Sequence, residues 1–286
     1  MTTQTWFITG SSRGFGRALT VAALEAGDQV VATARKPEQL DDLVAQYGDR
    51  VLPVALDVTD RGAAVAAIAA ATDRFGRVDV VVNNAGYANV APVETMPYDD
   101  FRQQFDTNFW GVYHVSIAAL PVLKAQGSGT IVQFSSIGGR VGGSPGLGSY
   151  QAAKFAVDGF TRVLAAETAP LGIRYLVVEP AGFATDWAGS SMQVHGIAAE
   201  YEATVGGFVR LREGSVVSKG DPERAGEILV RVVKQPNLPS HLLLGVDAVE
   251  MAQAYSRGQL DEAAAWDAVS RSADFSQAYP VDLPVD

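Results

Sequence analysis

The chain has 286 residues, of which 48% are hydrophobic and 19% charged, a composition typical of a globular protein rather than a disordered one. Its 32 acidic residues outnumber its 22 basic residues and give a net charge of -10, which disfavours nucleic acids and anionic membranes as partners because both bind basic surfaces. No cysteine is present, which excludes disulfides, thiolate metal sites and thiol catalysis.

The three histidines, His114, His195 and His241, are widely spaced and show no metal-ligand pattern, so we expect no metal site. The chain reaches an apolar run by Trp6 without a basic segment or a small-residue cleavage site, so we expect no signal peptide. No window has the apolar length that a membrane-spanning helix needs. These observations together predict a cytoplasmic protein.

Short apolar runs alternate with Ala-rich segments of helical spacing along the chain. The runs predict seven strands, at Trp6–Thr9, Gln29–Ala34, Val51–Leu56, Val78–Asn83, Thr130–Ser135, Tyr175–Glu179 and Leu242–Gly245. The segments between them predict helices at Gly16–Ala26, Arg61–Phe75, Tyr98–Ala125 and Ser149–Leu171. This alternation indicates an α/β protein with a doubly wound parallel sheet of about seven strands and helices on both faces.

No linker, repeat or low-complexity run precedes about Asp221, so we expect residues 1–286 to form a single domain. A stretch containing Gly and Ser at 183–220 interrupts the alternation where a substrate lid could lie. Beyond Asp247, the pattern predicts a helix from about 248 to 270, followed by a coil that contains proline. We expect this extension to cover the edge strand Leu242–Gly245 and to limit assembly to a dimer.

The first predicted strand runs directly into Gly10-Ser11-Ser12-Arg13-Gly14-Phe15-Gly16 and then into a helix. Glycines permit a tight turn and close backbone approach, while the free N–H groups and the positive end of the helix favour a pyrophosphate. A flexible helix entry is the alternative interpretation. The order of strand, turn and helix favours phosphate binding.

Tyr150 and Lys154 are four residues apart, which on a helix brings both side chains to one face. Reduction of a carbonyl needs a proton at the oxygen as hydride reaches the carbon, and a tyrosine with a pKa of ~10 is a poor donor near neutrality unless that value falls. A nearby lysine cation favours the phenolate and so lowers the pKa of the phenol. Taken alone, such a pair is more often a surface feature.

The Gly-x-x-x-Gly-x-Gly loop, the Asn83-Asn84-Ala85-Gly86 turn and the Tyr150-x-x-x-Lys154 pair follow one another in an order that resembles the short-chain dehydrogenase/reductase family. The resemblance extends from Trp6 to about Thr185. It implies a Rossmann-type fold and hydride transfer between a nicotinamide cofactor and a small-molecule carbonyl or secondary alcohol.

The same resemblance implies a set of cofactor-binding residues. Asp57 and Val58 match the pair that holds the adenine ring, Lys154 matches the lysine that holds the nicotinamide ribose, and Thr185 matches a threonine that contacts the cofactor. The full set is Gly10, Ser12, Arg13, Gly14, Phe15, Gly16, Arg35, Asp57, Val58, Asn84, Ala85, Gly86, Tyr150, Lys154, Pro180, Gly182 and Thr185. Ala181 departs mildly from the Pro-Gly sequence that the family usually has there.

The end of the second strand favours NADP(H) over NAD(H). Ala34 stands where a relative that prefers NAD would place an acid for the ribose 2′-hydroxyl. Arg35 follows it, and Arg13 lies inside the glycine loop, so two guanidinium groups can meet a 2′-phosphate with charge-assisted hydrogen bonds. The alternative is that both arginines are solvated surface charges.

Four residues are predicted to be catalytic by the resemblance: Asn108, Ser136, Tyr150 and Lys154. Ser136 matches the serine that binds the substrate oxygen, and Asn108 matches the asparagine that bends its helix and keeps a water in the proton relay. The interval from Ser136 to Tyr150 is one residue longer than in close relatives, with the extra residue placed in Gly142-Gly143-Ser144, so Ser135 remains the alternative serine.

Four large side chains favour a hydrophobic or aromatic substrate under the lid, although packing against the core explains them equally well: Trp187, Met192, Tyr201 and Phe208. The helices beginning near Tyr98 and Ser149 predict a homodimer or homotetramer. A non-catalytic NADP(H)-binding sensor is the main alternative function, because fold alone does not confer activity. Epimerisation or dehydration of nucleotide-linked sugars is less favoured, because those relatives have a larger C-terminal domain and a different glycine spacing.

Overall fold

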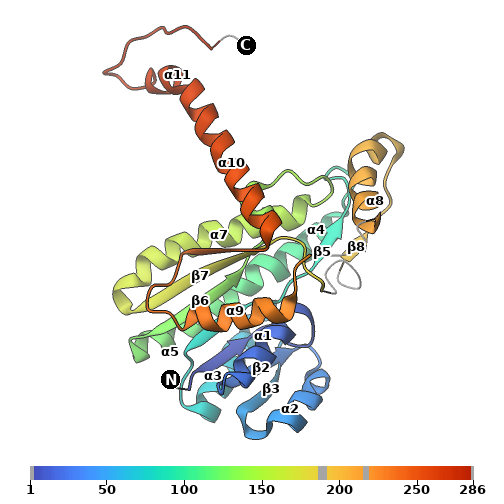
Figure 1. Ribbon diagram of the computed structural model, residues 1–286, viewed down its shortest axis with the longest axis vertical. Coiled ribbons are helices and arrows are strands. Elements are labelled where there is room, and N and C mark those ends of the chain that lie inside the picture. Colours follow the sequence, from blue (N-terminus) through green and yellow to red (C-terminus); the bar gives the residue numbers. More distant parts are fainter. Residues whose placement is uncertain (1–2, 186–191, 215–218, 285–286) are drawn as a thin grey trace.

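The computed structural model describes residues 3–185, 192–214 and 219–284. Its centre is a parallel sheet of seven strands in the order β3-β2-β1-β4-β6-β7-β9 (Figure 1). The strands are β1 (Thr5–Ile8), β2 (Gln29–Ala34), β3 (Val51–Ala55), β4 (Val80–Asn83), β6 (Gly129–Phe134), β7 (Ile173–Pro180) and β9 (His241–Leu244). The predicted Rossmann-type sheet is therefore confirmed, with each predicted strand in place.

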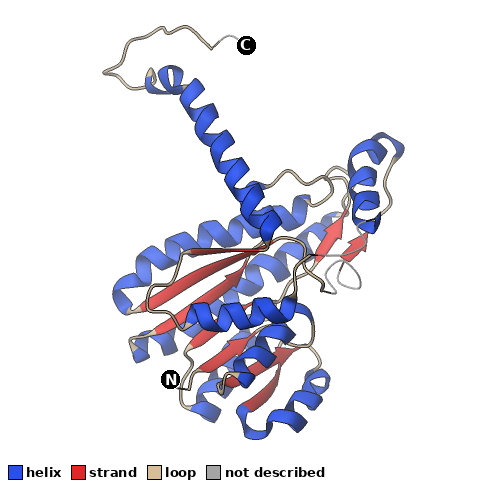
Figure 2. Cartoon of the chain, in the orientation of Figure 1, coloured by secondary structure: helices blue, strands red, loops and turns tan. Residues whose placement is uncertain are grey.

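Helices cover both faces of this sheet (Figure 2). On one face lie α1 (Gly14–Glu25) and α9 (Pro222–Val233), and on the other α3 (Arg61–Phe75), α5 (Gly111–Gln126) and α7 (Gly148–Thr168). Alternate residues of a strand enter opposite layers, as β1 illustrates: Trp6 and Ile8 pack with Leu19 of α1, whereas Phe7 packs with Ile68 of α3. The continuous apolar runs of the strands follow from this burial on both faces.

The predicted helix Tyr98–Ala125 is interrupted. It begins as α4 (Tyr98–Phe105), passes through a π-helical turn, η3 (Asp106–Trp110), and continues as α5. A single wide turn inside a helix often marks a functional site. The remaining α-helices of the described chain are α2 (Asp41–Tyr47), α6 (Gly138–Val141), α8 (Gly207–Gly214), α10 (Val246–Ala265) and α11 (Asp267–Arg271), and a second π-helical turn, η7 (Glu202–Gly206), precedes α8.

A second, two-stranded sheet was not predicted from the sequence. It pairs β5 (Ala88–Val90) in parallel with β8 (Met192–Val194) and so ties the segment after β4 to the predicted lid. Three-residue strands are too short to show a recognisable pattern of alternation.

Helix α10 differs from the expectation for the C-terminal extension. Its first turns bury Ala248 and Ala252 against α6 and β9, but residues 253–268 are all exposed, and Figure 1 shows the helix projecting away from the body. Cover over edge strand β9 is therefore limited to those first turns. Within the described ranges, no helix is both long enough and apolar enough to cross a membrane.

A buried carboxylate fixes the amino ends of the first two strands. Asp28, which precedes β2, is 1% exposed and accepts hydrogen bonds from the indole Nε1 of Trp6 at 3.0 Å and the backbone N–H of Gln4 at 3.1 Å. It also pairs with the Lys234 ammonium at 2.7 Å. One side chain thus joins β1, β2 and the end of α9.

Replacing Asp28 with alanine should lower the free energy of unfolding by about 3 to 5 kcal/mol, because it leaves Lys234 and the Trp6 indole without their buried acceptor. Denaturant titration measures the loss. The control is Asp49→Ala, which breaks the exposed Arg74–Asp49 pair and should change stability by less than about 1 kcal/mol. Equal effects of the two substitutions would contradict this account of Asp28.

Candidate active site

A cavity of about 1400 Å³ opens at the carboxyl ends of the strands. Its wall is built from the segments that directly follow β1, β2, β3, β4, β6 and β7, joined by residues of α7 and β8. Parallel strands bring their carboxyl ends to one edge of the sheet, and ligands of such folds bind where the strand order reverses. All the site residues predicted from the sequence line this cavity except Gly16 and Asn108.

The glycine loop is closely packed against the turn that follows β4. Gly10 and Gly14 have φ values of +70° and +54°, which favour glycine. At Gly16 the requirement for glycine is steric. A Cβ there would lie 2.2 Å from the Gly10 carbonyl oxygen and 2.5 Å from Asn84 Nδ2. Asn84 Nδ2 itself donates to the carbonyl of Thr9 at 2.9 Å, so the loop and the turn hold one another.

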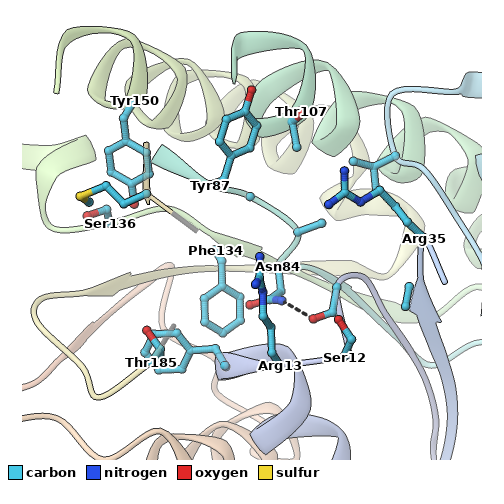
Figure 3. A pocket seen from close by; sticks show the side chains of 18 of the residues that line it. Ser12, Arg13, Arg35, Asn84, Tyr87, Thr107, Phe134, Ser136, Tyr150 and Thr185 are labelled. Carbon is cyan, nitrogen blue, oxygen red and sulfur yellow. Dashed lines mark hydrogen bonds between the residues drawn. The ribbon is translucent and has the colours of Figure 1, made fainter. Parts of the chain in front are cut away.

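The start of α1 faces the cavity through this loop. The helix begins at Gly14, and its N-cap residue, Arg13, makes no side-chain capping hydrogen bond to it. Ser12, Arg13 and Arg35 line the same region of the cavity, and Figure 3 places them at a distance from Tyr150. Two guanidinium groups and the positive end of a helix therefore line the cavity wall.

Tyr150 and Lys154 occupy neighbouring turns of α7 and both line the cavity, where Figure 3 shows Tyr150 apart from Ser12 and Arg35. Both side chains are buried, at 7% and 4% exposed, and the Lys154 Nζ lies 5.8 Å from the centre of the Tyr150 ring. The ammonium donates to the carbonyl oxygen of Phe134 at 2.6 Å. Burial lowers the pKa of Lys154 from 10.5 to about 8, because desolvation disfavours its charged form.

The two serines that follow β6 have different environments. Ser135 is buried, and its hydroxyl donates to the carbonyl of Lys154 at 3.2 Å. The Oγ of Ser136 accepts the backbone N–H of Gly138 at 3.0 Å, which leaves its proton available to a substrate oxygen. Ser136 and Tyr150 both line the cavity. This arrangement favours Ser136 over Ser135 for binding a substrate.

Asn108 lies behind the cavity wall rather than in it. It is fully buried in the π-helical turn, where its Oδ1 accepts the Tyr87 N–H at 3.1 Å and its Nδ2 donates to the Tyr87 carbonyl at 2.8 Å. A Cβ on Gly86 would lie 3.0 Å from Asn108 Oδ1 and 3.7 Å from Lys154 Nζ. Asn108 thus holds the backbone at Gly86 and Tyr87, and this segment lies between Asn108 and Lys154.

Several residues of the cavity wall were missed by the sequence reasoning. Tyr87 follows the Asn-Asn-Ala-Gly turn directly, so its position could have indicated it. Phe134 and Phe183 contact the Phe15 ring, with centroids 5.4 and 4.8 Å away, and form an aromatic floor. No sequence signal marked Gln103, which comes from α4.

The described part of the predicted lid packs beside Tyr150. Met192 lines the cavity, while Tyr201 and Phe208 pack on an apolar cluster that contains Tyr150 and Leu147. Trp187, the remaining predicted lid residue, lies outside the described residues. The surroundings of Tyr150 are therefore largely apolar on this side.

The fold and the site define a Rossmann-type protein with a Tyr-Lys pair in the cavity at the carboxyl ends of its strands. Comparison with known proteins leads to the same class. The chain matches the family described as short chain dehydrogenase over residues 4–194 and belongs to that family of oxidoreductases, which bind a nicotinamide cofactor. It is 53% identical over 252 residues to a protein named Oxidoreductase BOA17 from Botryotinia fuckeliana, covering 87% of this chain and 92% of that one.

Two solved structures are also similar. A short-chain dehydrogenase from Streptomyces avermitilis has a TM-score of 0.89 and 37% identity, covering 96% of this chain and 99% of the other. One from Burkholderia cenocepacia, in complex with NADP, has a TM-score of 0.74 and 26% identity, covering 92% and 96%.

Substituting Gly16 with alanine should weaken cofactor binding about 5- to 100-fold, because the added methyl overpacks the glycine loop at a cost of about 1 to 3 kcal/mol. Fluorescence titration with NADPH and with NADH measures the change. Gly159→Ala is the control, because Gly159 is exposed on α7 and a Cβ there meets nothing within 4 Å. Unchanged affinity in Gly16→Ala would show that the loop does not shape the cofactor site.

Proposed function

We propose that the protein is an NADP(H)-dependent oxidoreductase that moves a hydride between the nicotinamide and a carbonyl or secondary alcohol of a hydrophobic small molecule. The observation that supports this most is that Ser136, Tyr150 and Lys154 line the same cavity as Arg13 and Arg35, and Figure 3 shows Tyr150 apart from both arginines. A cofactor bound between them would present its nicotinamide to Tyr150 and its adenosine to Arg35.

The residues present fit such a cofactor. The glycine loop and the start of α1 would hold the pyrophosphate, Asp57 and Val58 the adenine, and Arg13 and Arg35 the 2′-phosphate. The segment Asn84–Gly86 and Lys154 would border the nicotinamide ribose, with Pro180, Gly182 and Thr185 at the nicotinamide itself. The NADP in the Burkholderia structure also favours this choice.

The bound nicotinamide supplies and accepts the hydride. In the chain, Ser136 donates a hydrogen bond to the substrate oxygen, and Tyr150 delivers its phenolic proton to that oxygen during reduction. The Lys154 Nζ lies 5.8 Å from the centre of the Tyr150 ring, where its positive charge would stabilise the negative charge that forms on the phenol oxygen as the proton leaves. Asn108 holds the chain segment at Gly86 and Tyr87, which keeps the space beside Lys154 open for the proton relay.

The substrate side of Tyr150 is lined by apolar residues, including Leu147 and Met192, which suits a hydrophobic ketone, aldehyde or alcohol.

A homodimer or homotetramer is supported by an aromatic surface on α4, η3, α5 and α7, where Trp110 is 43% exposed and packs edge-on against Phe109 and Tyr113. We further propose that residues 1–286 form one domain, and the cytoplasmic location stays a prediction.

The main rival function is a sensor that binds NADP(H) without turning over a substrate. The combined presence of Ser136, Tyr150 and Lys154 in the cavity disfavours it, because binding of a nucleotide alone does not need a serine and a tyrosine hydroxyl at the substrate position. The proposal and its rival differ in what they require of the Tyr150 hydroxyl.

Removing that hydroxyl in Tyr150→Phe should lower kcat by about 100-fold or more, because a general acid contributes roughly 10² to 10⁴ in rate. NADPH oxidation at 340 nm over a panel of ketones, aldehydes and quinones measures it, with NADPH affinity expected to stay within about threefold. Tyr255→Phe, on the projecting part of α10, is the control. Full activity in Tyr150→Phe would overturn the proposed mechanism.

Cofactor choice has its own test. Arg35→Ala should raise the Kd for NADPH by about 10- to 100-fold, since a hydrogen bond to a charged group contributes about 1.5 to 3 kcal/mol, and should leave the Kd for NADH nearly unchanged. Arg257→Ala, which removes an exposed guanidinium of α10, serves as the control. Equal weakening of both cofactors would mean that Arg35 does not read the 2′-phosphate.

A further inference from the structure

An ion pair between a buried carboxylate and a partly exposed guanidinium joins the two loops that border the Ser136 side of the cavity. Glu179, at the end of β7, is 1% exposed, and the Arg140 Nε of α6 lies 3.1 and 2.9 Å from its two carboxylate oxygens. The Arg140 Nη2 adds a third contact at 2.9 Å. β7 leads directly into the segment Pro180–Gly182, and α6 begins two residues after Ser136.

Backbone contacts carry this link on to Ser136. The N–H of Ile137 donates to the carbonyl of Pro180 at 3.0 Å, and the N–H of Ser135 donates to Val178 at 2.9 Å. The first residue of α6, Gly138, donates its N–H to the Ser136 Oγ at 3.0 Å. A shift of α6 would therefore move the group that orients the Ser136 hydroxyl.

The first turns of α10 join the same two loops through apolar contacts. Ala248 and Ala252 of α10 form a buried cluster with Ile137, and Val141 and Ala181 pack against it. The loop after β6 and the loop after β7 are thus held together twice, by an ion pair and by an apolar cluster.

An ion pair at this place is not explained by stability alone. Taking a carboxylate out of water costs several kcal/mol, and a buried pair is often no more stable than apolar side chains of the same volume. A fork of guanidinium nitrogens on a carboxylate instead fixes distance and orientation. Geometry matters here, because a misplacement of about 1 Å at a reacting group can cost roughly 100-fold in rate.

We propose that Arg140 and Glu179 are positioning residues. They fix the position of the Ser136 hydroxyl relative to the Pro180–Gly182 loop, and so the distance and orientation between the substrate oxygen and the nicotinamide. The kinetic part of this inference rests on the proposed function. The geometric part concerns only the two loops and can be tested without a substrate.

Glu179→Gln keeps the shape of the side chain and removes its charge. It should lower kcat for NADPH-dependent reduction by at least about tenfold, with a smaller change in the KM for NADPH. Asp28→Asn is the matched control: it breaks the Asp28–Lys234 pair, of similar burial at the amino ends of the strands, and should lower the Tm with kcat unchanged.

A double variant separates positioning from stability. Arg140→Gln with Glu179→Gln leaves no unpaired buried charge, so its Tm should recover toward the wild-type value, while kcat stays low because the fork contact is gone. If kcat instead followed Tm across Glu179→Gln, the double variant and Asp28→Asn, the pair would be structural only and the proposal would be overturned.

Hydrogen exchange tests the geometry in the protein without ligand. In Glu179→Gln, the amides of Ile137 and Gly138 should exchange at least about tenfold faster, while amides in the middle of α5 keep their rates. Unchanged exchange at both amides would overturn the proposal. Should the wild-type protein reduce no carbonyl, the proposed function would fail by itself, and the exchange result would still decide the role of the pair.

Discussion

The site depends on one constraint: the strands of the central sheet all run in the same direction. Their carboxyl ends meet at one edge, so six loops from distant parts of the sequence line a single cavity. Burial on both faces holds the strands that carry these loops, because residues of β1 alternate between two apolar layers. The loops can then carry polar and glycine-rich sequences without supplying stability themselves.

Local contacts at this edge turn the arrangement into a shaped site. Gly16 lets the loop after β1 pack on Asn84, and the π-helical turn buries Asn108 where it grips the backbone of Tyr87. Both residues lie outside the cavity wall, yet they set the position of residues that form it. The buried Lys154 is the energetic cost of the site, since desolvation lowers its pKa to about 8.

Sequence patterns predicted the parts of the fold that repeat. Apolar runs of four to six residues identified all seven strands of the sheet, because burial on both faces leaves a continuous signal. The π-helical turn was visible only as an asparagine in a helix, and β5 and β8 were too short to see. The direction of α10 away from the body could not be predicted, because its sequence pattern does not show that only its first turns contact the rest of the protein.

For the site, motifs with fixed spacing were enough to place the glycine loop, Tyr150 and Lys154 around one cavity. Contacts between residues distant in the sequence were not accessible. Arg140 and Glu179 are separated by 39 positions, and only the folded chain brings them together. The same holds for the aromatic floor formed by Phe15, Phe134 and Phe183.

The central claim is that the chain carries out hydride transfer rather than only binding a nucleotide. The most direct test is turnover of a panel of ketones and aldehydes with NADPH that carries deuterium at both C4 positions, with the products analysed by mass spectrometry. The account predicts that one alcohol product gains one deuterium at the former carbonyl carbon. Saturable NADPH binding with no labelled alcohol from any ketone or aldehyde would contradict it and would favour a sensor.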